Sequence, residues 1–424
     1  MPVFTRGLRF AASFTLGLLV ACNGEPDQPS PASPGLIDGA GSGAGAPPTT
    51  AMVAETASPP GYPAFPMTPA QLVTRGGKIL KAPKLVLLTY AGDPLAAVAT
   101  EFVSMIGNSS YWSGATKEYG VGPATALSAV TLSDRAPATI DQTGIETWLA
   151  GELDGSHAEV PAPDGETVYV IVYPASTTIT RGAELGCQDF GGFHAEAAAG
   201  ASGAVPYVAL PRCSTFAGLS GNDLLTYTMS HEIVEAMLDP FTESGPAYSD
   251  VDKLHETLAI ALGGGEAGDI CPEDATHVPD MPFLVQRTWS NASAKTGHQP
   301  CVPRDPLPYF FANPMLPDLS TDGVPVVKVE VGKNRSIDLQ LSSDAPMGAD
   351  WTVTLIDVAT LRKKPAELSF TLDRTTGNNG DVLHATISSL RGGTVGTKGG
   401  YSLFLVRSVS KDERVSLLAG GVQN

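Results

Sequence analysis

The sequence predicts two folded units in series: an α/β or α+β unit over residues 78–317 and an Ig-like β-sandwich over 318–424. In the first unit, buried-strand runs such as KLVLLTYAG and TVYVIVYP alternate with segments of helical periodicity. In the second, about seven short alternating runs are separated by turns such as TTGNNGD, which is typical of a sandwich. That second unit carries no convincing catalytic cluster, so we expect an accessory or binding module.

The elements of the first unit follow from local patterning. The prolines of AVPYVALP favour an edge strand, because proline cannot donate to a sheet ladder. Asn222 is a suitable N-cap for the helix NDLLTYTMSHEIVEAML, and Asp239-Pro240 ends that helix. In chain order we expect strand 84–92, helix 94–107, strand 129–133, helix 143–153, strand 167–174, edge strand 204–211 and helix 222–238.

The first 22 residues have the order of an export signal. Arg6 and Arg9 precede the apolar run FAASFTLGLLVAC, which is too short to span a bilayer comfortably. The run ends in a sequence that resembles a bacterial lipoprotein cleavage box, with Cys22 as the lipidated residue. The alternative is a plain secretory signal. We therefore expect an exported protein of the bacterial cell envelope, held at a membrane by lipid, with the outer membrane as the expected location.

Residues 23–77 predict a disordered linker. The segment is rich in Gly, Ala, Pro, Ser and Thr, as in SPASPGLIDGAGSGAGAPPTT, and has few large apolar residues. It cannot bury enough surface to offset the entropy of ordering. We expect a flexible stalk between the anchor and the folded units.

The charge of the chain restricts its partners. A formal net charge of −18 argues against nucleic acid, whose phosphates favour binding by Lys and Arg. A cation, a neutral polymer such as a glycan, or another extracellular protein is the more natural partner.

The remaining cysteines predict disulfides. Without Cys22 the chain keeps Cys187, Cys213, Cys271 and Cys301, an even number in an oxidising compartment. Three pairings are possible, and the sequential one closes two loops of moderate length. Zinc ligation is less favoured because no Cys-x-x-Cys pair occurs.

One helix carries the candidate chemistry. In SHEIVEAMLDP, His231 and Glu235 are four residues apart and share a helix face, and Asp239 extends the stripe. The spacing is similar to the His-Glu-x-x-His helix of zinc peptidases, with Glu232 as the base and Glu235 as the second metal ligand. The alternative is a solvated or salt-bridged acidic face.

A third ligand should come from GGGEAGDIC, which supplies Glu266 and Asp269 beside Cys271. His255 with Glu256 is a weaker candidate. His194 lies beside Cys187 and could point into the same cleft, or it could be an ordinary residue of a Gly-rich loop. One imidazole with carboxylates makes a harder site than two imidazoles, so calcium or manganese become alternatives to zinc.

Several stretches together resemble the EXORDIUM-like, or phosphate-induced, extracellular family. EFVSMIGNSSYWSGATKEYG, GCQDFGGFHAE and YVALPRC are similar to the plant members. SHEIVEAMLDP, GEAGDIC and VQRTWSNASAKTGHQPCVP resemble a secreted bacterial branch. The plant members lack the His-Glu pair and are associated with growth signalling, whereas the bacterial type carries it. The resemblance implies a zincin-like domain with a mixed sheet, in which the strand AVPYVALP lines the substrate cleft. The interval from Asp239 to Gly265 is longer than in compact bacterial members, which leaves the third ligand open.

Three functions follow from these features. The first is a lipid-anchored, metal-dependent hydrolase, most simply a peptidase. The second is a non-catalytic protein that recognises an extracellular glycan or protein. The third is a structural lipoprotein stabilised by calcium.

Overall fold

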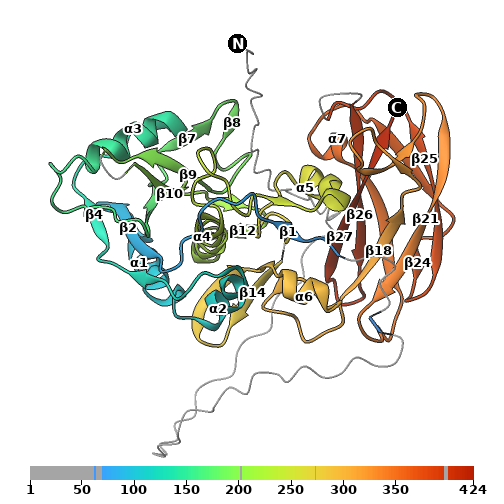
Figure 1. Cartoon of the computed structure of the whole chain (residues 1–424), viewed down its shortest axis with the longest axis horizontal. Coiled ribbons are helices and arrows are strands. Elements are labelled where there is room, and N and C mark those ends of the chain that lie inside the picture. The colour runs from blue at the N-terminus through green and yellow to red at the C-terminus, as the bar shows by residue number, and fades with distance from the viewer. Residues whose placement is uncertain (1–61, 64–68, 201–202, 273, 396–399) are drawn as a thin grey trace, which may run out of the picture.

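The structure is a computed structural model that describes residues 62–63, 69–200, 203–272, 274–395 and 400–424 (Figure 1). The predicted export signal, Cys22 and most of the predicted linker lie outside the described residues. In the described part of the chain, no helix is both long and apolar enough to cross a membrane. The helices are α1 Ala96–Ile106, α2 Ser110–Thr116, α3 Gln142–Glu152, α4 Gly221–Leu238, α5 Glu256–Leu262, α6 Asn291–Lys295 and α7 Val358–Leu361.

The chain forms a mixed α/β structure in which strands predominate, and the first unit is built on one sheet. Its strand order is β3-β2-β6-β10-β9, with β4 also paired to β2. All pairings are parallel except that of β9 with β10. The strands are β2 Lys84–Tyr90, β3 Thr125–Ala126, β4 Val130–Leu132, β6 Thr167–Val172, β9 Phe193–Ala198 and β10 Ala204–Leu210.

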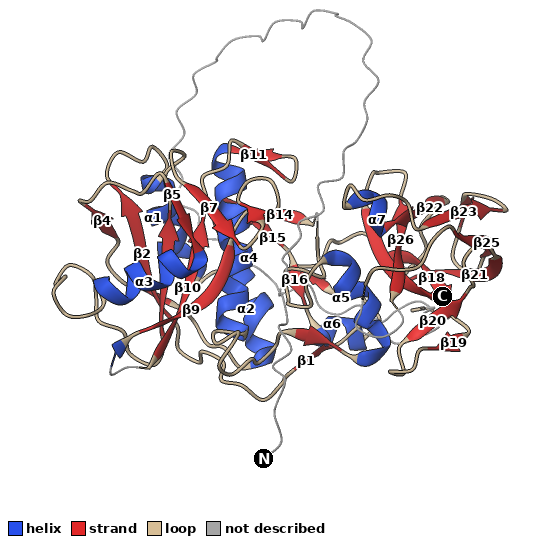
Figure 2. Cartoon of the chain, turned by 90° about the horizontal axis from the view of Figure 1, so that it is seen from above, coloured by secondary structure: helices blue, strands red, loops and turns tan. Residues whose placement is uncertain are grey.

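Both faces of this sheet are covered, which explains its near-continuous apolar strands. Alternate residues of β6 point to opposite sides: Val170 packs in one core with α1 and α4, and Ile171 packs in a second core with α3. In Figure 2, α4 lies between the central sheet and the hairpin formed by β14 (Ala275–Val278) and β15 (Met281–Gln286).

The predicted edge strand proves to be internal. Strand β10 lies between β6 and β9, and β9 is its antiparallel neighbour on the outer side. Proline is tolerated because Pro206 precedes the pairing of β10 with β6, which begins at Tyr207. The expectation that AVPYVALP forms an edge was therefore wrong, and β9 takes that position.

Helix α4 is buried along most of its length, with every residue from Leu224 to Leu238 inside the protein. The helix ends as predicted, with Asp239 at its C-cap. Its start differs from the prediction: Ser220, not Asn222, is the N-cap residue, and its side chain makes no capping hydrogen bond. The expected polar stripe therefore faces other parts of the chain and not water.

Short strand pairs connect these elements. Strand β1, which falls within the predicted linker, pairs with β13, so the ordered chain begins before residue 78. The remaining short strands are β1 Leu72–Val73, β5 Thr139–Asp141, β7 Thr178–Arg181, β8 Glu184–Leu185, β11 Thr215–Phe216, β12 Leu219–Ser220, β13 Asp250–Val251, β16 Thr288–Trp289 and β17 Cys301–Val302.

The C-terminal unit consists of two sheets around one apolar core, shown at the orange-red end of Figure 1. The sheet orders are β18-β21-β25-β23 and β19-β20-β27-β26-β22-β24, and all pairings are antiparallel except that of β20 with β27. The strands are β18 Phe310–Met315, β19 Asp318–Leu319, β20 Pro325–Lys328, β21 Asn334–Ser343, β22 Trp351–Asp357, β23 Leu368–Leu372, β24 Thr376–Gly377, β25 Val382–Ser389, β26 Tyr401–Val409 and β27 Val415–Gln423. The chain thus enters this unit at Phe310.

The two units share a core. Leu258 and Leu262 of α5 belong to the same buried cluster as Leu403 and Leu405 of β26. Arg362, just after α7, donates a hydrogen bond to the carbonyl oxygen of Ile260 in α5 at 2.7 Å. Helix α5 therefore joins the central-sheet unit to the C-terminal sheets.

Candidate metal centre

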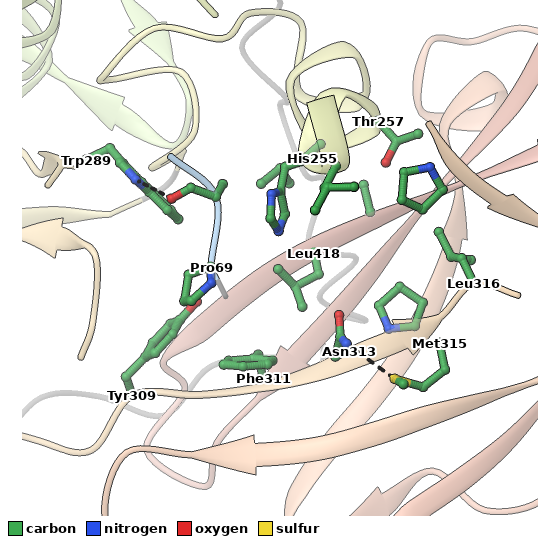
Figure 3. A pocket seen from close by; sticks show the side chains of 16 residues that line it. Pro69, His255, Thr257, Trp289, Tyr309, Phe311, Asn313, Met315, Leu316 and Leu418 are labelled. Atoms are coloured by element: carbon green, nitrogen blue, oxygen red, sulfur yellow. Dashed lines mark hydrogen bonds between the residues drawn. The ribbon is translucent and has the colours of Figure 1, made fainter. Parts of the chain in front are cut away.

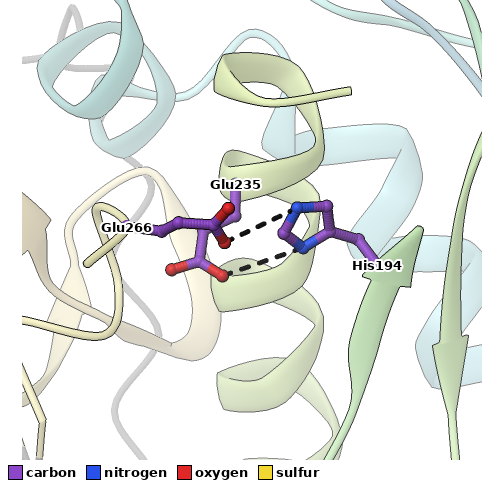
Figure 4. Close-up of side chains that lie close together, drawn as sticks. All are labelled: His194, Glu235 and Glu266. Atoms are coloured by element: carbon purple, nitrogen blue, oxygen red, sulfur yellow. Dashed lines mark ion pairs between the residues drawn. The ribbon is translucent and has the colours of Figure 1, made fainter. Parts of the chain in front are cut away.

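Three segments that are distant in sequence meet at one face of α4. The helix contributes His231, Glu232 and Glu235, the loop after α5 contributes Glu266 and Asp269, and strand β9 contributes His194. Figure 4 shows the ring of His194 turned toward the carboxylates of Glu235 and Glu266. The structure thus brings together all four residues expected as metal ligands and adds a second imidazole.

Of the alternative, a solvated or salt-bridged acidic face, the solvated form is wrong, whereas ion pairs of Glu232 and Glu235 with His194 and His231 are present. The side chain of Glu235 is 1% exposed, and those of Glu232 and His231 are 5% and 9% exposed. Charged groups buried to this degree need partners, because an unpaired ion loses its hydration without compensation. The partners of these carboxylates therefore decide what the site is.

The first ligand group comprises His231, Glu235 and Asp269. The Nε2 atom of His231 lies 3.0 Å from Oε2 of Glu235 and 3.8 Å from Oδ1 of Asp269. Ligand atoms lie about 2.0–2.6 Å from a bound zinc or calcium ion, so two ligands of one ion are at most about 5 Å apart. The donor set and its spacing fit a divalent ion.

Gln286 fixes which nitrogen of His231 faces these carboxylates. Its Nε2 donates to the carbonyl oxygens of Gly268 (2.8 Å) and Cys271 (3.2 Å), so its Oε1 must accept from Nδ1 of His231 at 2.9 Å. Nδ1 therefore carries a proton, and in the neutral imidazole the lone pair of Nε2 points at the carboxylates. An imidazole oriented in this way by a second residue is typical of metal ligands.

Glu235 is held by one oxygen and left open at the other. Its Oε1 accepts hydrogen bonds from the backbone N–H groups of Gly268 (2.8 Å) and Asp269 (3.2 Å). Its Oε2 is buried and has no hydrogen-bond partner. Burial opposes ionisation, but His231 and His194 hold the pKa of Glu235 down at about 2. Apart from its ion pairs with His231 and His194, this buried and ionised oxygen has no partner, so a cation could bind to it.

His194 reaches the cluster from the edge strand. Its Nδ1 lies 3.5 Å from Oε2 of Glu232 and 3.8 Å from Oε2 of Glu235, and its Nε2 lies 3.5 Å from Oε2 of Glu266. That Nε2 atom is buried without a hydrogen-bond partner. The approach depends on Gly192, where a Cβ atom would come within 2.9 Å of Cγ of Glu232. The sequence suggested a loop histidine, but the strand directs it inward.

Acidic groups outnumber imidazoles in the cluster, and the pKa values of these acids reflect the repulsion between buried carboxylates. Burial, followed by Glu235, raises the pKa of Asp269 to about 7. Burial, with Glu235, Asp269 and Asp239 next, raises the pKa of Glu266 well above its usual value. Burial lowers the pKa of His231, but Glu235 and Glu232 outweigh it and raise that pKa strongly. Without a cation, the cluster must therefore retain protons near neutral pH.

Two other candidates have different roles. Asp239 caps the end of α4, where its Oδ1 accepts from the backbone N–H of Ala247 at 2.5 Å and its Oδ2 is buried without a partner. His255, at the start of α5, is paired through Nδ1 with Asp252 at 2.8 Å and belongs to neither ligand group. The suggestion that His255 and Glu256 supply the third ligand was wrong.

The predicted disulfides form in the sequential pairing. Cys187 is bonded to Cys213, and Cys271 to Cys301. The second bridge ties the end of the Glu266–Asp269 loop to β17. A pair of disulfides fits the predicted export to an oxidising compartment.

A cavity of about 180 Å³ lies elsewhere, between α5, β18 and β27 (Figure 3). Its wall is mostly apolar and aromatic, with His255 and Asn313 among the polar groups. Pro69 and Ala70 close one side, where the carbonyl oxygen of Ala70 accepts from Nε1 of Trp289 at 3.2 Å. None of the six cluster residues lines it.

We expect Gly268→Ala to damage the centre. A Cβ atom at this position would lie 2.4 Å from Nδ1 of His231 and 3.0 Å from Oε1 of Glu235. The overlap should cost about 1–3 kcal/mol of unfolding free energy and displace the His231 ring from Gln286. The matched control is Gly151→Ala in α3, where a Cβ atom meets nothing within 4 Å. That change should stabilise the helix by about 0.5–1 kcal/mol. Chemical denaturation measures both, and equal effects would contradict this packing.

Comparison with known proteins assigns no family. No protein-family description and no curated protein matches the chain. Among solved structures, domains 4 and 5 of the S-layer protein SbsC match with a TM-score of 0.17 and 13% identity, over 26% of this chain and 48% of that one. This chain thus spans about half of that structure.

Two further structures are similar at the same level. A Bacteroides thetaiotaomicron lipoprotein matches with a TM-score of 0.18 and 14% identity, over 27% of this chain and 80% of that one. A Bacteroides ovatus GH5 xyloglucanase matches with a TM-score of 0.14 and 9% identity, over 25% of this chain and 18% of that one. Likeness at this level assigns neither a fold nor an activity.

Proposed function

We propose that this chain is an exported, lipid-anchored metalloprotein whose centre hydrolyses peptide bonds. His231, Glu235 and Asp269 would hold the ion, and the observation that carries the proposal is the convergence of these three side chains, in which the buried Oε2 of Glu235 lies 3.0 Å from Nε2 of His231. The tautomer imposed by Gln286 supports it, because the lone pair of Nε2 is directed at the same point.

The fold and family follow as part of the same proposal. A sheet with one antiparallel outer strand, crossed by the helix that bears the ligands, supports a zincin-like assignment for the first unit. Two antiparallel-rich sheets around one core support an Ig-like assignment for the second. Membership of the bacterial EXORDIUM-like branch, attachment through Cys22 and location in the outer membrane belong to the proposal.

Zinc is the first choice of metal, because imidazole and carboxylate groups both bind zinc, and three protein ligands leave a fourth position for water. Calcium and manganese are alternatives, because oxygen atoms are the majority of the donors. When bound, a divalent ion would polarise a peptide carbonyl and make a water molecule more acidic.

Glu232 would serve as the general base. It is next to His231 in the helix, and its Oε1 lies 3.9 Å from Nε2 of that residue. Its other oxygen, Oε2, lies 3.5 Å from Nδ1 of His194. In this position Glu232 would take a proton from the attacking water and deliver it to the leaving amine. Asp269 and Glu266, 9% and 14% exposed, mark the side of the cluster nearest to solvent.

The test combines metal content with peptide cleavage, using the full-length exported protein. We expect stoichiometric metal in the wild type and loss of the ion on His231, Glu235 and Asp269 in His231→Ala. Glu232→Gln should keep the metal and lose at least 100-fold in cleavage of a fluorogenic peptide library, since general base catalysis contributes about 10²–10⁴-fold. The control is His384→Ala, a histidine that is 62% exposed in β25. A wild type without metal, or unchanged peptide cleavage by Glu232→Gln, would contradict the proposal.

A second candidate function is non-catalytic binding of a small extracellular ligand such as a glycan unit. The cavity of Figure 3 favours it, because aromatic walls with a few polar groups are typical of ligand sites. Binding of this kind should survive chelation and His231→Ala but be weakened by Phe311→Ala, as measured by titration calorimetry with soluble oligosaccharides.

A further inference from the structure

We infer that the cluster binds two divalent cations that share Glu235: one on His231, Glu235 and Asp269, the other on His194, Glu235 and Glu266. The first ion is that of the proposed function, on which this inference rests, and the second is new. Each group offers three ligand atoms that all lie within 4.8 Å of one another.

The geometry places one carboxylate between two imidazoles. The same atom, Oε2 of Glu235, lies 3.0 Å from Nε2 of His231 and 3.8 Å from Nδ1 of His194. Backbone N–H groups engage the other oxygen of Glu235, so Oε2 alone is available to both sides. A carboxylate held in this way is suited to bridge two ions.

The second group has its own unsatisfied atom. Nε2 of His194 is buried without a hydrogen-bond partner, and the side chain is only 5% exposed. The nearest acidic atom to this Nε2 is Oε2 of Glu266, at 3.5 Å. The nitrogen lies on the Glu266 side of the cluster, so an ion on His231, Glu235 and Asp269 does not explain it.

The net charge of the cluster also favours a second divalent ion. Five acids gather here, namely Glu232, Glu235, Asp239, Glu266 and Asp269, and within the described residues all their ion pairs are with His194 or His231. If all five are ionised and both imidazoles are neutral, one divalent ion leaves a net charge of −3 in a buried volume. Two divalent ions leave −1. Because uncompensated buried charge is costly, the second ion relieves most of the repulsion that the first ion leaves.

The arrangement implies a particular way of binding substrate. In two-metal hydrolases the ions lie about 3.5–4 Å apart and stabilise both the attacking and the leaving atoms. Here His194 would hold the second ion from β9, the outer strand of the sheet, next to which an extended peptide can pair. Glu232 lies near both imidazoles and would remain available as the base.

The test is metal stoichiometry in the full-length protein after equilibrium dialysis against Zn²⁺ and, separately, Mn²⁺. We expect two ions per chain in the wild type and in the control His384→Ala. His194→Ala and Glu266→Gln should each retain one, and Glu235→Gln should retain none. Mn²⁺-loaded wild type should show a spin-coupled electron paramagnetic resonance signal that His194→Ala converts to that of an isolated ion.

The outcomes separate the two claims. One ion per chain, lost in His231→Ala but kept in His194→Ala, overturns the second site and leaves the proposed function standing. No ion overturns both. Two ions unaffected by His194→Ala and Glu266→Gln also overturn the second site, because the extra ion is then bound elsewhere. If these variants fail to fold, anomalous scattering from metal-loaded wild-type crystals decides: two peaks about 3.5–4 Å apart support the inference, and one peak overturns it.

Discussion

Removal of divalent ions by a chelator is expected to lower the midpoint of thermal unfolding by roughly 4–8 °C. A ligand present at 1,000 times its dissociation constant stabilises the folded state by about 4 kcal/mol. The entropy of unfolding is about 2.1 cal/mol/K per residue, so for a chain of this size each kcal/mol corresponds to roughly 1–2 °C. The physical reason is that the acids around Glu235, which are buried and close together, repel one another once the cation is gone. Scanning calorimetry with and without chelator measures the shift.

Two variants make the chelation result specific. His231→Ala should show a smaller shift with chelator than the wild type, because it no longer holds the first ion. In chelator, Glu266→Gln should be at least as stable as the wild type, because it replaces a carboxyl group whose pKa burial raises strongly. When metal is present, the variant should be less stable than the wild type, because it lacks a ligand. A wild type insensitive to chelator, or an equal shift in His231→Ala, would contradict the site.

Loss of the Cys271–Cys301 disulfide is expected to weaken metal binding at least tenfold. The ligand Asp269 lies two residues before Cys271, whose carbonyl oxygen accepts from Gln286 at 3.2 Å. Without the bridge, the loop must be ordered on binding, at about 1–2 kcal/mol per residue, and 1.4 kcal/mol is a factor of ten in affinity. Competition titration of Cys271→Ser/Cys301→Ser with a chromophoric chelator measures the change.

The other disulfide is a matched control. Cys187–Cys213 spans 26 residues and Cys271–Cys301 spans 30, so each bridge should contribute about 3–4 kcal/mol by restricting the unfolded chain. Cys187→Ser/Cys213→Ser should therefore lose similar stability while keeping the affinity for the ion on His231. Equal losses of affinity in both variants would show that the loop needs no anchoring by Cys271.

The part of the site that the sequence predicted is local. His231 and Glu235 are one helical turn apart, and Asp269 stands next to a cysteine, so spacing alone was enough to nominate them. Gln286 could not be found in this way, because its role depends on β15 packing against α4. Only the folded chain places its amide between two backbone carbonyls and a ring nitrogen.

The position of His194 also could not be predicted from its neighbours in the sequence. The glycines before it suggested a loop, since glycine is common where the chain turns. In the structure, Gly191 and Gly192 bring the backbone close to α4, and the strand begins at Phe193. The burial of α4 was missed for a related reason. A polar helix face suggests solvent, but here the partners of that face come from β9 and from the loop after α5.

The core that α5 shares with β26 has a mechanical consequence. Leu258 and Leu262 are packed in one cluster with Leu403 and Leu405, so the C-terminal sheets cannot rotate freely relative to the unit that contains α4. A molecule bound by those sheets would be held at a fixed distance and orientation relative to Glu235. The shape and length of a target would then decide whether it can contact both units at once.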